Sequence, residues 1–166
     1  LLNPFFGSFL LLNYLFVVIT KNNKKLYKVL AIFLAILLGL INTTKVPEND
    51  IIWHTQYFLK SGDFSLLGYL VFVGKDPFFY FFNYIFYYLS NGNVRLWMLT
   101  FSFISYILFF ISLIKFSKKV NFSNSQLLLA LALAAFFPRL FSLSAHGVGQ
   151  FVASAIFIYF GIDKSF

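Results

Sequence analysis

The sequence predicts an all-α membrane protein: a polytopic transmembrane helix bundle with amphipathic interfacial helices in one long outer loop. Its 166 residues are 60% hydrophobic and only 11% charged, and the mean hydropathy is +0.83. The apolar residues form runs close to the roughly 20 residues that cross a bilayer as a helix. Four of the five acidic residues fall between residues 43 and 93, and ionised groups are costly in lipid.

The apolar runs set the expected elements, which form a single transmembrane domain over residues 1–166. We expect spans at about residues 1–19, 26–41, 94–114, 126–143 and 150–162, with residues 43–93 as the outer loop. The chain begins without methionine and stops soon after an apolar run. We therefore expect it to be a fragment of a longer multi-span protein.

Clusters of lysine set the expected orientation. They lie beside the apolar runs, at residues 21–28, at residues 115–119 and at Lys164. The cytoplasmic ends of membrane spans are enriched in Lys and Arg, so we expect these clusters in the cytoplasm and the loop 43–93 outside. This placement accounts for the net charge of +8, and we expect no nucleic-acid partner.

The aromatic segment 77–90, PFFYFFNYIFYYLS, has two interpretations. At about 14 residues it is short for a span, and a crossing here would put the lysines at 115–119 outside. Its Tyr and Phe residues suit the headgroup region, so we expect an interfacial helix on the outer surface. An ordinary tilted span is the alternative.

A helix is expected to begin near Pro47 and continue through Ser61, because Pro and acidic residues suit a first turn. At 100° per residue, a polar stripe contains Asp50, His54, Tyr57 and Ser61, and the opposite side carries Ile51, Ile52, Thr55, Phe58 and Leu59. The stripe either faces water or forms a site. In the second case Asp50 is a general base or a substrate ligand, tuned by a hydrogen bond from His54.

Two more polar segments are candidates for the same site. Lys75 and Asp76 precede Pro77, which favours an extended backbone at Asp76 and a new helix after it. This pair is either a turn with an N-cap or a second polar group beside the cavity. His146 and Gln150 belong to an outer turn and are expected to line the cavity from above.

Common soluble-enzyme motifs are missing from the sequence. It contains no nucleotide-binding Walker loop, no G-x-S-x-G, no H-E-x-x-H and no metal-ligand spacing. With two His and no Cys, we expect neither a metal site nor a cofactor.

The order of the polar segments resembles that of a known family. Asp50 and Tyr57 are followed by Asp76-Pro77-Phe78-Phe79, and Gly149-Gln150-Phe151-Val152-Ala153 opens the last apolar run. This order is similar to the EpsG-type, Wzy-like polysaccharide polymerases, which carry D-x(6)-Y, an acid-Pro-aromatic segment and R-Q-x-x-A. The resemblance covers residues 42–161 and extends distantly to the GT-C glycosyltransferases. Gly149 stands where the family has Arg.

The resemblance implies roles for the polar residues. Asp50 would deprotonate the acceptor hydroxyl, and the helical spacing adds His54 as a catalytic candidate beside it. Arg139 or Lys75 would neutralise the lipid pyrophosphate, as cations do for leaving phosphates. Trp53 and Tyr57 would stack on sugar rings, and Asp76, His146 and Gln150 would complete the substrate site.

The expected function is that of a bacterial inner-membrane polymerase that joins polyprenyl-pyrophosphate-linked oligosaccharide repeats at the outer face. The product class (capsule, O-antigen or exopolysaccharide) stays open. Expected partners are the lipid-linked oligosaccharide and the bilayer, with a flippase and a chain-length regulator as further candidates. The alternatives are a GT-C transferase that uses a polyprenyl-phosphate sugar donor, and a polysaccharide transporter or non-catalytic membrane subunit.

Overall fold

The computed structural model describes residues 24–44, 50–136 and 148–164, and every element in these ranges is helical. The elements are α2 (Lys24–Thr43), α3 (Asp50–Lys60), the 3-10 helix η1 (Ser61–Asp63), α4 (Leu66–Val73), α5 (Pro77–Ser90), α6 (Val94–Lys119), α7 (Asn124–Phe136) and α9 (Val148–Lys164). The all-α prediction is confirmed for these residues. The expected span 1–19, the helix start at Pro47 and the end of the expected span 126–143 lie outside the described residues.

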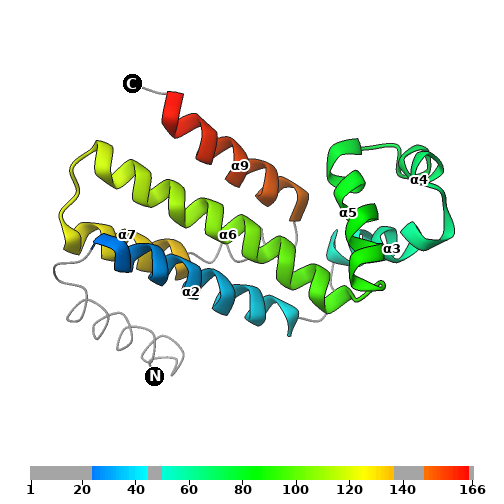
Figure 1. Ribbon diagram of the computed structural model, residues 1–166, viewed down its shortest axis with the longest axis horizontal. Coiled ribbons are helices and arrows are strands. Elements are labelled where there is room, and N and C mark those ends of the chain that lie inside the picture. The colour runs from blue at the N-terminus through cyan, green and yellow to red at the C-terminus, as the bar shows by residue number, and fades with distance from the viewer. Residues whose placement is uncertain (1–23, 45–49, 137–147, 165–166) are drawn as a thin grey trace.

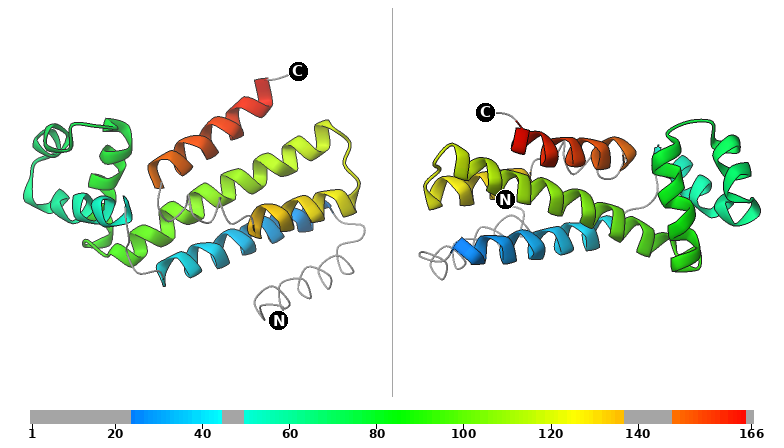
Figure 2. Two further views of the ribbon diagram at one scale, coloured as in Figure 1. Left: turned by 180° about the vertical axis from the view of Figure 1, so that it is seen from behind. Right: turned by 45° about the horizontal axis from the view of Figure 1, so that its top comes forward.

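Helices α2, α7 and α9 pack around α6 in an elongated bundle (Figure 1). Helix α2 runs antiparallel to α6, whereas α9 runs parallel to it, and the same arrangement is visible from behind (Figure 2). All four helices contribute to one hydrophobic core, which includes Leu34, Tyr106, Phe110, Leu131 and Phe151. The bundle therefore shares one apolar core, built from side chains of α6 and its three neighbours.

Two of the helices are long and apolar enough to cross a membrane. They cover Leu26–Thr43 and Val94–Lys119, each with a hydropathy of 2.1, and they contain the expected spans 26–41 and 94–114. Helix α6 continues past residue 114 because the lysines that follow are good helix formers. Two shorter apolar helices, Asn124–Ala135 and Gln150–Ile162, complete the bundle.

The contact between α2 and α6 combines a small residue with a buried hydrogen bond. A Cβ atom at Gly39 would lie 3.1 Å from Leu99 Cδ1 and 3.3 Å from the Leu99 carbonyl oxygen, so glycine allows the helices to approach closely. Nearby, Asn42 Nδ2 donates to Ser102 Oγ over 2.9 Å, and both side chains are buried. Small residues and interhelical hydrogen bonds of this kind are typical of helix pairs in membranes.

Helices α3, α4 and α5, with η1, form a compact group beyond the N-terminal end of α6, which we call the head (residues 50–90) (Figures 1 and 2). Helix α5 runs across this end of α6 instead of alongside it (Figure 1). Ile51 and Phe58 of α3 are buried in one cluster with Trp97 of α6, which seats the head on the bundle.

Local signals explain the boundaries within the head. Ser65 caps α4 by accepting a hydrogen bond from Gly68 N, and Gly74 ends the helix with φ 65°. Gly62 lies against the Tyr87 ring, because a Cβ atom there would be only 2.4 Å from the Tyr87 hydroxyl oxygen. Helix α5 has the predicted bounds, with Pro77 in its first turn.

The lysine clusters gather at the end of the bundle that lies opposite the head, which we call the basic end (Figure 1). Lys118 and Lys119 occupy the last turn of α6, and the Lys119 ammonium group donates to the Ile162 carbonyl oxygen of α9. Lys115 lies 3.8 Å from the centroid of the Tyr159 ring. Because α2 is antiparallel to α6, Lys24 and Lys28 begin that helix at the same end.

Candidate functional site

A hollow of about 390 Å³ lies where the head meets the start of α9. It is lined by Asp76, Pro77, Phe78 and Phe79 at the start of α5 and by Gln150 and Ala153 at the start of α9. Its volume falls within the roughly 300–1,000 Å³ typical of small-molecule sites. Two polar segments that are distant in the sequence therefore meet at one cavity.

The backbone of Asp76 departs from the sequence prediction. Its φ of 43° and ψ of 54° are left-handed, so the expected extended conformation is wrong. Asp76 occupies the N-cap position of α5 but its side chain makes no capping hydrogen bond, and the residue lines the hollow. Non-glycine residues in this conformation cost energy and are concentrated at functional sites.

His54 and Tyr57 of the polar stripe pack against α5 and are partly buried. His54 Nδ1 lies 3.1 Å from the Tyr80 hydroxyl, and the His54 ring meets the edge of Phe79 with centroids 5.6 Å apart. Phe79 in turn lines the hollow. The Phe79 ring therefore lies between His54 and the hollow, and the contact with His54 helps to fix the position of Phe79.

Tyr57 joins the stripe to the loop before α5. The Lys75 ammonium group lies 5.4 Å from the centroid of the Tyr57 ring, a cation–π contact, and Tyr57 also packs edge-on against Tyr80 at 5.6 Å. This contact places the Lys75 ammonium group over α3, while Asp76, the next residue, lies at the start of α5. The remaining predicted stripe residue, Ser61, is buried in η1 and bonds to the Tyr57 carbonyl oxygen.

Two buried tyrosines, Tyr69 of α4 and Tyr80 of α5, pack in one cluster behind the hollow. Burial raises the pKa of Tyr69 to about 12, with a smaller opposing effect of the nearby Ser61 and Asn83 side chains. Burial, followed by the nearby Tyr69, also raises the pKa of Tyr80 well above its ordinary value. Tyr80 therefore stays protonated at neutral pH and can donate to Nδ1 of His54 in the tautomer that carries its proton on Nε2.

A hydrogen bond to Trp97 fixes α5 to the bundle. Trp97 is fully buried, donates from Nε1 to Asn83 Oδ1 over 2.8 Å, and stacks on Phe58 with centroids 5.4 Å apart. Sequence reasoning did not single out Tyr80, Asn83 or Trp97. Tyr80, Asn83, Tyr84 and Tyr87 recur at helical spacing in the aromatic segment, and this pattern was the signal for a buried face.

The remaining predicted site residues are placed only in part. Asp50 begins α3, and its neighbour Ile51 is buried in a cluster that Phe79 and Val152 also join, so this helix starts beside the α5–α9 contact. Trp53 is 60% exposed on the outer face of α3. Arg139 and His146 lie outside the described residues.

The charged groups at or beside the hollow have both signs: Asp76 lines it, and exposed Lys75 precedes Asp76 in the sequence. Residues of the first turns of α5 and α9 line it, and a helix N-terminus carries a partial positive charge with unpaired N–H groups. Within the described ranges, no three His, Asp or Glu side chains are grouped to hold a metal ion.

Comparison of the chain with protein-family models, with curated proteins and with solved structures found no match.

Proposed function

We propose that the chain is part of a membrane-embedded polymerase that joins polyprenyl-pyrophosphate-linked oligosaccharides. One observation carries this proposal: the hollow brings Asp76-Pro77-Phe78-Phe79 together with Gln150 and Ala153. These are two of the segments on which the family resemblance depends. Two segments that bind one substrate must lie at the same cavity. Their order in the sequence does not by itself bring them together.

The proposal includes a polytopic bundle in the bacterial inner membrane with the head on the non-cytoplasmic side. Helices α2 and α6 are long enough to span, and α7 and α9 are the shorter apolar helices beside them. The lysines at the ends of α2 and α6 gather opposite the head, which is the asymmetry expected when the basic end faces the cytoplasm. Asp63 and Asp76 are both in the head.

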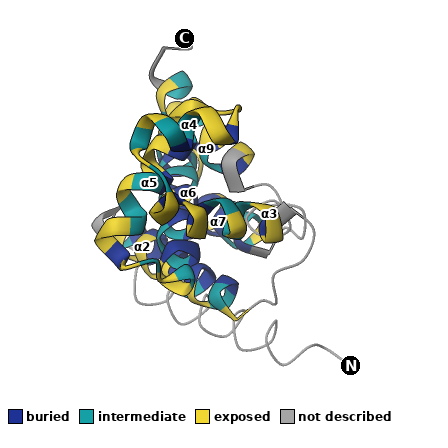
Figure 3. Cartoon of the chain, turned by 90° about the vertical axis from the view of Figure 1, so that its right-hand side faces the viewer, coloured by how far each residue is buried: buried dark blue, intermediate teal, exposed yellow. Residues whose placement is uncertain are grey.

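The outer surface of the head suits contact with lipid. Leu67 and Val71 on α4 are 76% and 81% exposed, and Phe78 and Leu89 on α5 are 70% and 76% exposed. Figure 3, seen from the head end, shows exposed stretches along both helices. If α4 and α5 lay in the interface of the outer leaflet, this apolar surface would be buried in lipid. The hollow would then lie at the level of the lipid phosphates.

In the proposed reaction, a sugar hydroxyl attacks C1 of the donor sugar, the new glycosidic bond forms, and polyprenyl pyrophosphate leaves. The resemblance gives the role of general base to Asp50, whereas the lining of the hollow favours Asp76, whose carboxylate does not cap its helix. Lys75 and the starts of α5 and α9 would stabilise the departing pyrophosphate. The exposed Trp53 offers a ring for sugar stacking.

The continuity of α6 favours this function over transport. Transporters commonly form their substrate sites with broken helices near the middle of the membrane. Helix α6 is unbroken over 26 residues, and three of its buried serines, Ser105, Ser112 and Ser117, donate to carbonyl oxygens of the same helix. The described polar groups with candidate chemistry are instead in the head.

Cysteine labelling tests the orientation on which this function depends. Asp63 and Lys118 are both exposed, at opposite ends of the molecule, and the chain has no native Cys. We expect Asp63→Cys to react with a membrane-impermeant maleimide in intact cells, and Lys118→Cys to react only after permeabilisation. Labelling of Lys118→Cys in intact cells, with Asp63→Cys protected, would place the hollow in the cytoplasm and refute outer-face polymerisation.

A further inference from the structure

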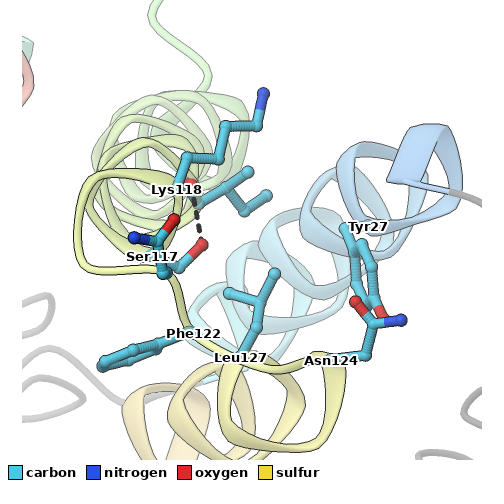
Figure 4. Close-up of a pocket in the computed structure, with 8 residues that line it drawn as sticks. Tyr27, Ser117, Lys118, Phe122, Asn124 and Leu127 are labelled. Atoms are coloured by element: carbon cyan, nitrogen blue, oxygen red, sulfur yellow. Dashed lines mark hydrogen bonds between the residues drawn. The ribbon is translucent and has the colours of Figure 1, made fainter.

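A second cavity, of about 200 Å³, lies at the basic end between α2, α6 and α7 (Figure 4). Its lining includes Tyr27, Ser117, Lys118, Asn121, Phe122 and Asn124. The volume is below the roughly 300 Å³ at which sites for drug-sized ligands begin. The cavity therefore suits a small group, such as a single phosphate with its nearest substituents.

The lining offers hydrogen-bond donors and one cation. Asn121 and Asn124 carry amide N–H groups and Lys118 an ammonium group, and no carboxylate is among the residues that line the cavity. Ser117 is buried and donates its hydroxyl proton to the Ile114 carbonyl oxygen over 2.8 Å, so the donors that face a ligand come from the other polar residues (Figure 4). Ammonium and amide donors together are a favourable environment for a phosphate.

The charged side chains around this cavity are mainly lysines, with the same positive sign as Lys118. Lys115 and Lys119 contact α9, whereas Lys118 lines the cavity. Lys28 is exposed on α2 one residue after Tyr27, and in the described part of the chain Asp163, near the end of α9, is the one acid at this end. Attraction by several lysines, each contributing on the order of 1 kcal/mol at an anionic membrane surface, would concentrate anionic lipids here.

Apolar side chains beside the cavity indicate the source of the phosphate. Val120 and Phe122 are 45% and 37% exposed at the turn between α6 and α7, and Phe122 also lines the cavity. Both follow Lys118 and Lys119 at the end of α6, which is where a spanning helix meets the headgroup region. We propose that this cavity binds the phosphate-bearing headgroup of an anionic lipid in the leaflet at the basic end. This site is separate from the hollow in the head.

Native mass spectrometry of the full chain, released from detergent micelles, tests this site. The probes are phosphatidylglycerol and a diacylglycerol with the same acyl chains, which lacks the phosphate. We expect phosphatidylglycerol to be retained in preference to diacylglycerol, and Lys118→Gln to weaken that retention about tenfold, because it removes a charge-assisted contact. Lys118→Arg should restore retention.

The matched control is Lys60→Gln, which makes the same charge change in the head, where Lys60 lies over the Phe72 ring. It should bind phosphatidylglycerol like the unaltered chain. Equal retention of diacylglycerol, or equal losses in Lys118→Gln and Lys60→Gln, would overturn the site. Displacement of the lipid by excess inorganic phosphate would overturn the lipid as its source. Because Lys118 is exposed, far-UV circular dichroism should show unchanged helicity in these variants.

Discussion

Replacing Asp76 by Asn is expected to reduce polymer formation by roughly 100- to 10,000-fold, the usual contribution of a general acid–base group. The change keeps the size of the side chain and removes its charge. Because the Asp76 carboxylate makes no capping hydrogen bond, the start of α5 should be unaffected. The measurement is polymer length and amount in cells that depend on this chain, at equal protein level in the membrane fraction.

Asp63→Asn is the matched control, since Asp63 is an exposed acid of the head that does not line the hollow. It should leave the polymer unchanged. Asp50→Asn separates the two assignments of the base. If Asp50 is the base, its variant should be the inactive one and Asp76→Asn should retain activity. Normal polymer in both variants would exclude a carboxylate base in the head.

Replacing Trp97 by Ala is expected to destabilise the chain by roughly 3–5 kcal/mol, as is usual when a fully buried large aromatic is truncated. The loss has two causes. The Phe58 ring would lose its stacking partner, and Asn83 Oδ1 would lose its donor. Because Asn83 is buried, an acceptor left without its donor adds a desolvation penalty to the loss of packing.

Unfolding in detergent micelles, followed by far-UV circular dichroism, measures this effect, and trypsin cleavage after Lys60 and Lys75 reports the opening of the head. The other tryptophan of the chain provides the control. Trp53 is 60% exposed, so Trp53→Ala should change stability by less than about 0.5 kcal/mol. Equal destabilisation by the two substitutions would contradict the role of Trp97 as the anchor of the head.

Helical segments with clear start and stop signals were predictable from the sequence. The bounds of α5 match the expected segment 77–90, because Pro77 begins it and Asn91 and Gly92, both with positive φ, end it. The expected spans 26–41 and 94–114 fall within α2 and α6 because long apolar runs are the strongest sequence signal.

The sequence did not predict which element each helix face packs against. The stripe of His54 and Tyr57 was identified, but whether it faced water depended on the packing of α5 against α3. The left-handed backbone of Asp76 opposes the local preference of a residue before proline. Similarly, the meeting of Asp76 with Gln150 depends on the tertiary contact between the head and α9, which no local pattern encodes.

Site-specific photocrosslinking tests the central claim most directly, that the hollow between α5 and α9 holds a lipid-linked saccharide. A benzoylphenylalanine would replace Phe78, which lines the hollow, or Leu89, which is similarly exposed at the other end of α5. We predict a saccharide-bearing adduct on irradiation of cells with the probe at position 78 and none with the probe at position 89. Adducts of equal yield at both positions, or none at position 78, would contradict the claim.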